Sequence, residues 1–434
     1  LILSLAVIVI VMNIFSQLKR FLHNKELQPV CKTAFSLEPS LDTAVEEICS
    51  KLKNIDLSSL ALVFISSHFA SDFPRLLPLL KKRLKAEIWL GCAGNAVFGV
   101  MEDGRLLENH KIPSLSITLI TLPHTKLIPF HIPQKSEFDL DDPGKVWSKY
   151  IKTDNSQVSS GIIFIDPEMQ LYNDLLTSFD FVFPKSNLIG GIGSYHSSPH
   201  GSIFFQDKVC KGAVGILIEG LWRLDTLVTR GVKPIGPILE VESVKQNILL
   251  KLRDKDNQLI SPVEFLNKLI DDLSENDRDL LQKSLFLGIE NKNMKISSKG
   301  ELSSDGTFVV RDLLGIDPIN GSVAVADLLK IGQKVQFQSR DNDISQKEIE
   351  IGLRKLIDET PSKPLLTILL SCFSRGSLSN QVDISELDYA KKMLKDIPFC
   401  GGFFQGEIGQ INGNTHLHGY SACWGLIVKN SCEE

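Results

Sequence analysis

The sequence predicts a mixed α/β protein with a two-half architecture, in which repeated strand–helix–strand units build mixed sheets. The first observation is a set of three glycine-rich stretches of similar shape: "AEIWLGCAGNAVFG" at 86–99, "SNLIGGIGSYHSSPHGSIFF" at 186–205 and "IPFCGGFFQGEIG" at 397–409. The second is that an apolar run precedes each of them, at 60–68, 161–169 and 366–374. An amphipathic stretch separates the two members of each pair, as expected for one structural unit that occurs three times.

Length and composition indicate a soluble globular protein with more than one core. The chain has 434 residues, of which 43% are hydrophobic and 23% charged, and one ordinary core rarely extends over such a length. With 47 basic and 52 acidic residues the sequence offers no basic field for a nucleic acid, and we interpret "KKRLK" at 81–85 as a solvated helix face. The eight cysteines form no CxxC pair, which favours a reducing, cytoplasmic location.

The first 26 residues are set apart by the apolar run "LILSLAVIVIVMNIF". A membrane-spanning helix needs about 20 predominantly apolar residues, whereas Asn13, Ser16 and Gln17 interrupt this run early. We therefore expect residues 1–26 to be a tail that results from a gene model extended upstream of a true start at Met12. An N-terminal membrane anchor is the alternative interpretation.

The first unit is preceded by a helix. In "SLDTAVEEICSKLKNI" apolar residues recur at helical spacing behind Ser40, a residue type that caps helix N-termini. The buried strand "LALVFIS" follows, and then the helix "DFPRLLPLLKKRL", in which Pro74 fits the first turn and Pro78 is expected to cause a kink. "EIWLGC" returns as a strand, and "SLSITLITL" at 114–122 extends the sheet. The second unit repeats strand, helix and glycine-rich strand between 161 and 205.

The remaining segments join the second unit to the third. Two runs complete the first half, at 212–220 and 223–236. Between the halves, Ser261, Pro262 and Glu264 form a capping box in front of a helix. An exposed loop is expected at 290–306, and strands are expected on both sides of the turn at 317–321. The third unit then closes the chain.

These motifs, in this order, resemble the FIST domain family, whose name abbreviates F-box and intracellular signal transduction proteins. The N-terminal half of the family is resembled by "LVFISSHFASDFPRLLPLL", "WLGCAGNAVFG", "NLIGGIGS" and "GAVGILIEG…DTLVTRGVKPIG". The C-terminal half is resembled by "FVVRDLLGIDP", "LLSCFSRG" and "FCGGFFQGEIGQINGNTHLHGYSACWGLIV". The resemblance covers roughly residues 30–430 and is greatest to the stand-alone members from cyanobacteria.

The resemblance implies a FIST N-like domain at 27–236, a FIST C-like domain at 237–434, and an intracellular sensory protein that binds a small ligand. It suggests an amino acid or a similar polar metabolite as that ligand. No F-box, kinase, cyclase-like or chemoreceptor segment accompanies the match, so a signalling role is expected to require a separate partner protein. Neither a cofactor nor a catalytic activity is expected, because the sequence contains no Walker, dinucleotide-binding or serine-hydrolase motif.

The residues themselves favour a ligand site in the C-terminal half. Glycines after a strand let a ligand or another backbone approach closely, and in "FCGGFFQGEIG" Gly401 and Gly402 precede a lone carboxylate, Glu407. In "SCFSRG" Cys372 and Arg375 follow the end of a strand, where a guanidinium can hold a carboxylate or phosphate group. Close packing between the repeats and a surface ion pair of the arginine are the alternative interpretations.

An α-amino acid carries one ammonium and one carboxylate group, so a pocket for it needs one side chain of each sign. We therefore expect Glu407 to form the anionic half of the site and Arg375 the cationic half. The residues from the next strand that complete the expected set are Asn414, Thr415, His416 and His418.

Two other functions stay open. A thiol- or metal-dependent hydrolase would use Cys372 and Glu407 together with His416 and His418, which lie on one face of a strand and can bind a metal if a third ligand converges. The second open function is that of a protein-interaction adaptor, like the F-box relatives. A packed thiol and two half-exposed histidines are the commoner outcomes, so no catalytic or metal-binding residue is assigned.

Overall fold

The computed structural model describes residues 28–430 except 56, 102–105, 110, 140, 152–154, 291–307 and 376–385. The apolar run at 1–26 and most of the loop expected at 290–306 lie outside these residues. The described part contains eight α-helices and 26 strands. The strands form three six-stranded sheets and one eight-stranded sheet. None of these helices has the length and apolar composition needed to cross a membrane. The prediction of a mixed α/β fold is confirmed.

Three strand–helix–strand units give the molecule its framework. They consist of β2 (Ser58–Ser66), α3 (Phe73–Lys81) and β3 (Ala86–Gly94); β8 (Val158–Ile165), α5 (Tyr172–Val182) and β9 (Asn187–Ile192); and β22 (Leu366–Cys372), α9 (Glu386–Met393) and β23 (Phe399–Phe404). The two strands of each unit are parallel neighbours. The predicted threefold use of one unit is therefore confirmed.

The chain leaves each unit through its glycine-rich strand and adds a hairpin to the sheet of another unit. These hairpins are β4 (Ala96–Val100) with β5 (Leu106–Asn109), β10 (Ile203–Phe205) with β11 (Lys208–Cys210), and β24 (Gly406–Ile411) with β25 (Asn414–His418). The hairpin after the first unit pairs with β23, the one after the third unit with β9, and the one after the second unit with β3. Each sheet therefore receives the hairpin of one other unit, and the three exchanges together form a closed cycle.

Antiparallel strands complete the other edge of each sheet. They are β1 (Val30–Ser36) and β6 (Leu115–Thr121), β7 (Thr125–Ile132) and β12 (Ala213–Gly220), and β13 (Trp222–Thr229) and β26 (Ala422–Lys429). The three strand orders, β1-β6-β2-β3-β10-β11, β7-β12-β8-β9-β24-β25 and β13-β26-β22-β23-β4-β5, are equivalent position by position. Strands from both sides of residue 236 share two of these sheets, while the predicted domain boundary at that residue stays a prediction.

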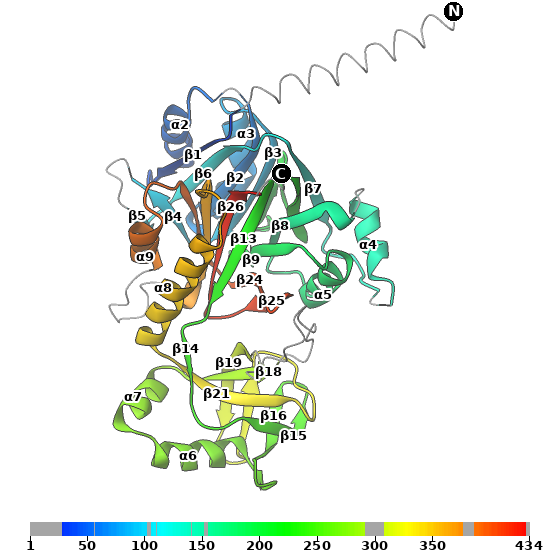
Figure 1. The fold of residues 1–434 in the computed structure, drawn as a ribbon, viewed down its shortest axis with the longest axis vertical. Coiled ribbons are helices and arrows are strands. Elements are labelled where there is room, and N and C mark those ends of the chain that lie inside the picture. The colour runs from blue at the N-terminus through cyan, green and yellow to red at the C-terminus, as the bar shows by residue number, and fades with distance from the viewer. Residues whose placement is uncertain are drawn as a thin grey trace, which may run out of the picture.

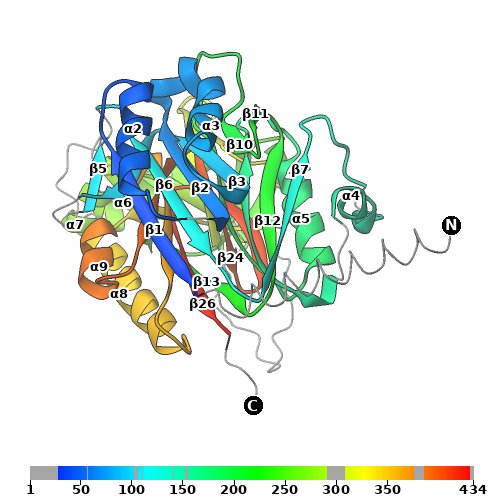
Figure 2. The same cartoon turned by 90° about the horizontal axis from the view of Figure 1, so that it is seen from above.

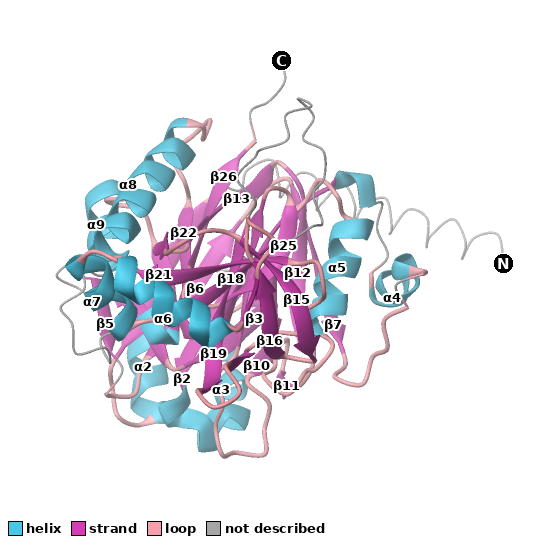
Figure 3. Cartoon of the chain, turned by 90° about the horizontal axis from the view of Figure 1, so that it is seen from below, coloured by secondary structure: helices cyan, strands magenta, loops and turns pink. Residues whose placement is uncertain are grey.

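The inner faces of the three sheets pack against one another and form a shared core. Phe64, Phe164 and Phe404 contribute one ring from each sheet, with ring centroids 5.5, 6.0 and 6.4 Å apart. The outer faces are covered by pairs of helices: α2 (Leu41–Lys51) with α3, α4 (Pro143–Tyr150) with α5, and α8 (Asn342–Asp358) with α9. Figure 2 shows these pairs around the sheets, and Figure 3 shows the same arrangement from the opposite side. We call the three sheets and these helices the body.

Local sequence signals fix several helix ends. The hydroxyl of Ser40 accepts a hydrogen bond from the Thr43 amide at 3.2 Å and caps α2, as predicted. Ser261 caps α6 (Pro262–Asp272) in the same way, through a 3.2 Å bond from the Glu264 amide. Pro78 lies inside α3. Short 3₁₀ helices are present at η1 (Ser67–Asp72), η2 (Asn155–Gln157) and η3 (Phe373–Arg375).

Residues 232–340 form a second lobe, which we call the insert lobe and which lies below the body in Figure 1. Its elements are β14 (Val232–Pro234), β15 (Leu239–Lys245), β16 (Ile248–Arg253), β17 (Leu259–Ile260), α6, α7 (Glu275–Lys283), β18 (Phe286–Glu290), β19 (Phe308–Asp317), β20 (Ser322–Val325) and β21 (Lys334–Arg340). The strands expected around the turn at 317–321 are β19 and β20. The lobe buries its own apolar cluster, which includes Val241, Leu287 and Phe337.

Candidate functional site

The third unit brings the main predicted site residues together at the end of β22. The amide of Cys372 donates to the carbonyl of Ser421 at 2.9 Å, and the η3 turn directly after it carries Arg375. Glu407 lies buried on β24 and is joined to them through Ser421, whose hydroxyl donates to its carboxyl group at 3.0 Å. The ionic-site hypothesis requires that segments 371–376 and 401–416 adjoin, and they do so over the described residues 371–375, while their contact with a ligand stays a prediction.

Glu407 is fully buried, an environment that disfavours the charge that the sequence suggested. Its Oε2 accepts a hydrogen bond from the Ser421 hydroxyl at 3.0 Å, while its Oε1 has no partner among the described residues. Burial raises the pKa of this carboxyl well above its usual range, and the Ser421 bond and the Arg375 charge only partly oppose the effect. Burial therefore favours the neutral form of Glu407, which argues against its expected role as the anionic half of an ionic site.

Arg375 is buried and its guanidinium is held by the protein. Its Nε and one terminal nitrogen contact a carboxylate oxygen of Glu386 at 2.7 and 2.6 Å. The other terminal nitrogen donates to the carbonyls of Arg230 at 3.0 Å and Tyr420 at 2.8 Å, and a further bond of 2.9 Å goes to the Ser345 hydroxyl. With every guanidinium nitrogen engaged, the expectation of a strand-end cation available to a ligand is wrong, because a side chain eleven positions later neutralises it.

The thiol of Cys372 is poorly suited to nucleophilic attack. Burial, and secondarily the nearby Glu407, raise the pKa of this thiol to about 12, whereas a nucleophilic cysteine needs a lowered pKa. The same burial effect raises the pKa of Cys400 to about 12. The thiol-dependent alternative therefore has no support in the geometry.

The histidines of β25 are also in a poor position for metal chemistry. Burial lowers the pKa of His416 to about 4 and that of His418 to about 3, which keeps both rings in the neutral form that binds metals. The Nε2 of His418, however, is already engaged, since it lies 3.1 Å from the Gly409 carbonyl. Their ring centroids are 6.0 Å apart. Over the part of the chain that the structure describes, no three His, Cys, Asp or Glu side chains are grouped so as to hold a metal ion.

The remaining predicted residues are explained by packing. A Cβ atom at Gly401, where φ is +141°, would overlap the Leu369 carbonyl oxygen, and one at Gly402 would lie 2.5 Å from the Ala96 carbonyl oxygen. These glycines are therefore needed for the close approach of β22 and β4 to β23. Thr415 is held through its amide and hydroxyl by the carboxylate of Asp180, both at 2.6 Å. Asn414 begins the edge strand β25.

A cavity of about 610 Å³ lies beside this cluster, between the insert lobe and the body, and we call it the junction pocket. Its lining residues are Asn276, Leu280, Lys283, Ser284, Leu285, Phe286, Asp312, Leu313, Arg340, Asp341, Asn342, Asp343, Ser374 and Tyr420. The sequence interpretation missed the pocket because its walls come from five separate segments. The available signals were "FVVRDLLG", which contains Asp312, and "SCFSRG", which contains Ser374.

Tyr420 connects the junction pocket to the buried cluster. Its ring lies 4.2 Å from that of Phe286 in the insert lobe, and its side chain is hydrogen-bonded to Asp312 and Ser374. The next residue, Ser421, holds Glu407. Burial raises the pKa of Asp312, and the bond from Tyr420 partly opposes this shift. The predicted residues thus lie behind one wall of the pocket rather than on its surface.

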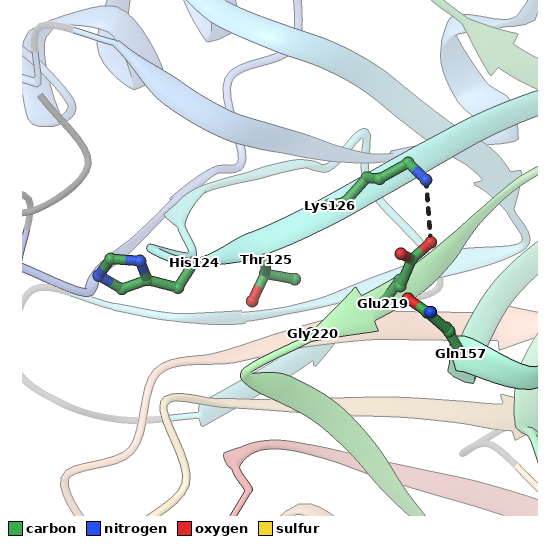
Figure 4. Close-up of a pocket in the computed structure, with 6 residues that line it drawn as sticks. All are labelled: His124, Thr125, Lys126, Gln157, Glu219 and Gly220. Atoms are coloured by element: carbon green, nitrogen blue, oxygen red, sulfur yellow. Dashed lines mark hydrogen bonds and ion pairs between the residues drawn. The ribbon is translucent and has the colours of Figure 1, made fainter. Parts of the chain in front are cut away.

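A second hollow, of about 550 Å³, lies at the ends of β7 and β12 and is drawn in Figure 4. Lys126 and Glu219 are direct cross-strand neighbours there and form an ion pair of 3.0 Å. The Thr125 hydroxyl accepts the Trp222 amide at 3.2 Å, and His124 lies on the other side of Thr125 from the ion pair. A cross-strand ion pair of this kind is ordinary for a sheet surface, so the junction pocket is the better candidate for a ligand site.

Comparison with known proteins places the chain in a family. The model of the FIST N domain matches residues 59–255, and that of the FIST C domain matches residues 262–410. An uncharacterized protein of Mycobacterium tuberculosis is 24% identical over 372 residues, which is 85% of this chain and 91% of the relative. An uncharacterized protein of Mycobacterium bovis is 27% identical over 269 residues, which is 62% of this chain and 67% of the relative.

A crystal structure of cyanuric acid hydrolase from A. caulinodans can be superimposed over 93% of this chain and 100% of its own, with a TM-score of 0.35 and 7% sequence identity. A likeness at this level supports no argument about fold or activity. The two domain matches, in contrast, cover most of the chain and confirm the resemblance that the sequence motifs indicated. FIST domains are in general sensory domains of signal transduction that bind small ligands. The chain belongs to the family of proteins that carry a FIST N and a FIST C domain.

Proposed function

We propose that this protein is a sensory protein that binds an amino acid or a similar polar metabolite in the junction pocket. The observation that carries the proposal is the composition of the pocket, which presents both signs of charge and an apolar wall between two lobes. A pocket of several hundred Å³ with a few polar groups among apolar ones is typical of small-molecule sites.

The lining residues match the parts of an α-amino acid. Asp312, half-buried beside Tyr420, is suited to an ammonium group, since a cation next to it would relieve the cost of its burial. Lys283 and Arg340 are suited to a carboxylate. The apolar residues of the wall, available to a side chain of the ligand, are Leu280, Leu285, Phe286 and Leu313.

The cluster behind the wall has a supporting role in this proposal. Cys372, Arg375 and Glu407 hold Ser374 and Tyr420 in place, and these two residues contact the ligand. A ligand in the junction pocket touches both the insert lobe and the body. A separate signalling partner that binds one relative orientation of these two parts can therefore respond to the bound ligand. This arrangement explains how a binding protein without catalysis can transmit a signal.

A thermal-shift screen with the twenty standard amino acids, followed by calorimetric titration, tests the proposal. A selective amino acid raises the melting temperature by mass action. Asp312→Asn and Lys283→Met should each weaken its binding about tenfold, or about 1.4 kcal/mol. Lys126→Met, which removes a cation from the other hollow, is the matched control and should leave the affinity unchanged. Equal affinities in all three variants, or no response to any amino acid, would contradict the proposal.

A further inference from the structure

The insert lobe is attached to the body through two neighbouring crossings of the chain. The chain enters the lobe after Arg230 and Gly231 and leaves it at Arg340 and Asp341. These crossings lie side by side, since Val232 pairs with Arg340 and the amide of Asp341 donates to the Gly231 carbonyl at 3.2 Å. Because the lobe buries its own apolar cluster, contacts at this junction determine how it is oriented on the body.

One guanidinium, that of Arg375, ties the first crossing to the body. It donates to the Arg230 carbonyl at the crossing and to the Tyr420 carbonyl at the pocket wall, at 3.0 and 2.8 Å. On its other side it is bound to Glu386 of α9 and to Ser345 of α8. Two helices of the body, the crossing and the pocket wall are therefore joined through a single buried side chain.

A second side chain holds the same crossing. Oε2 of Glu348, on α8, accepts hydrogen bonds from the amides of Arg230 and Gly231 at 2.9 and 2.7 Å. Gly231 has a φ of +64°, and a Cβ atom there would lie 2.6 Å from the Ser345 hydroxyl and 3.1 Å from Arg375. The crossing is thus packed tightly against α8 in a backbone conformation that favours glycine.

Tyr420 depends on the same guanidinium. This residue has a φ of +55°, which is uncommon for a residue with a side chain, and its carbonyl is bound by Arg375. Its ring packs on Phe286 and its side chain is hydrogen-bonded to Asp312, both in the insert lobe. Arg375 therefore joins the Arg230 carbonyl, just before the lobe begins, to Tyr420, whose side chain contacts the lobe, so these two points move together or stay fixed together.

We propose that Arg375 is a positioning residue: by joining the Arg230 crossing to Tyr420 it holds the insert lobe in the orientation that forms the junction pocket. The inference rests on the proposed function for its consequence, because a ligand that touches Asp312 on the lobe and Ser374 on the body favours that same orientation. Loss of Arg375 leaves the lobe free to adopt other orientations, and a smaller fraction of the molecules is then competent to bind.

The orientation of the lobe can be measured without any ligand. Spin labels can be attached through noncanonical amino acids at Lys255 in the lobe and Lys149 in the body. Pulsed electron paramagnetic resonance then measures the distance between the two labels. We expect a narrow distribution of distances in the unchanged protein and a broad one in Arg375→Met. The matched control is Arg223→Met, which breaks an ion pair of 2.7 Å with Asp225 at the other end of β13 and should keep the distribution narrow.

Glu348→Ala provides a second route if Arg375→Met does not fold, since Glu348 is partly exposed and binds the same crossing through the amides of Arg230 and Gly231. It should broaden the distribution as well. Addition of an equimolar mixture of the twenty standard amino acids should narrow the distribution again, and the affinity for the stabilising amino acid should fall about tenfold if the competent fraction falls to about one tenth.

The outcomes separate this inference from the proposed function. A narrow distribution in both variants overturns the positioning role, whatever the pocket binds. A broad distribution supports it, and a failure of every amino acid to narrow that distribution then counts against the proposed ligand and not against the positioning role of Arg375.

Discussion

The stability of the protein should depend on pH through Glu407, and its replacement by glutamine should remove this dependence. The unfolded chain releases the proton of this carboxyl around its ordinary pKa of 4.5, whereas in the folded protein burial raises that pKa well above this value. Between the two pKa values the folded state binds one more proton than the unfolded state. The free energy of unfolding therefore falls as the pH rises, by about 1.4 kcal/mol for each pH unit in that interval.

Glu407→Gln keeps the size of the side chain and an acceptor for the Ser421 hydroxyl, but it has no proton to release. The NH2 group of the new amide has no hydrogen-bond acceptor at its position among the described residues, and burying it unpaired costs about 1–3 kcal/mol of unfolding free energy at any pH. We therefore expect the variant to be less stable than the unchanged protein near pH 5. This disadvantage should shrink by about 1.4 kcal/mol for each pH unit until the pKa of Glu407 in the folded protein is reached.

Urea unfolding followed by circular dichroism at several pH values between 5 and 7 measures both slopes. Asp277→Asn is the control: a hydrogen bond from Lys233 lowers the pKa of Asp277 below its usual 3.8, so this group is ionised in both states over the whole range and its loss leaves the slope unchanged. Parallel plots for the unchanged protein and Glu407→Gln would refute the reasoning, because they would show that Glu407 is ionised in the folded protein.

Two further predictions concern the thiols and the glycines. Iodoacetamide at pH 8 should leave Cys372 and Cys400 unmodified in the native protein, since a pKa of about 12 leaves a thiolate fraction of about one in ten thousand; rapid native modification of Cys372 seen by mass spectrometry would show that its site is open. Gly401→Ala should cost more than about 4 kcal/mol of unfolding free energy or prevent folding, because its Cβ would overlap the backbone of β22. The matched change at Gly413, where φ is +76° but nothing lies within 4 Å, should cost about 1 kcal/mol, and similar losses at both positions would contradict the packing explanation.

The three units could be predicted from the sequence because their signals are local. Apolar runs, capping residues such as Ser40 and Ser261, and the glycine-rich strands all act within a few positions of the chain. The destination of the hairpins could not be predicted in the same way, because β4 is as apolar as β3 and nothing local tells the strands which sheet they join.

The candidate site shows the same limit. The adjacency of Cys372, Arg375 and Glu407 follows from the repeat, but their charges depend on partners that the repeat does not encode. Arg375 is bound by Glu386 and by the Arg230 carbonyl, which lies 145 positions earlier in the chain. An arginine after one strand and a glutamate on a later one therefore suggested an ionic site, whereas burial favours the neutral form of the glutamate and the protein engages the arginine.

The cyclic exchange of hairpins bears on how the protein is made. The sheet around β22 contains strands from residue 96 to residue 429. Its inner strand β26, which lies between β13 and β22, is the last strand of the described chain to leave the ribosome. During translation β4, β5 and β13 must wait with unpaired edges, and such edges are prone to wrong pairing. Pairings so distant in sequence are also slow to form. This sheet can therefore assemble only after β26 has been synthesised, and a nascent chain halted before β26 would be a natural client for chaperones.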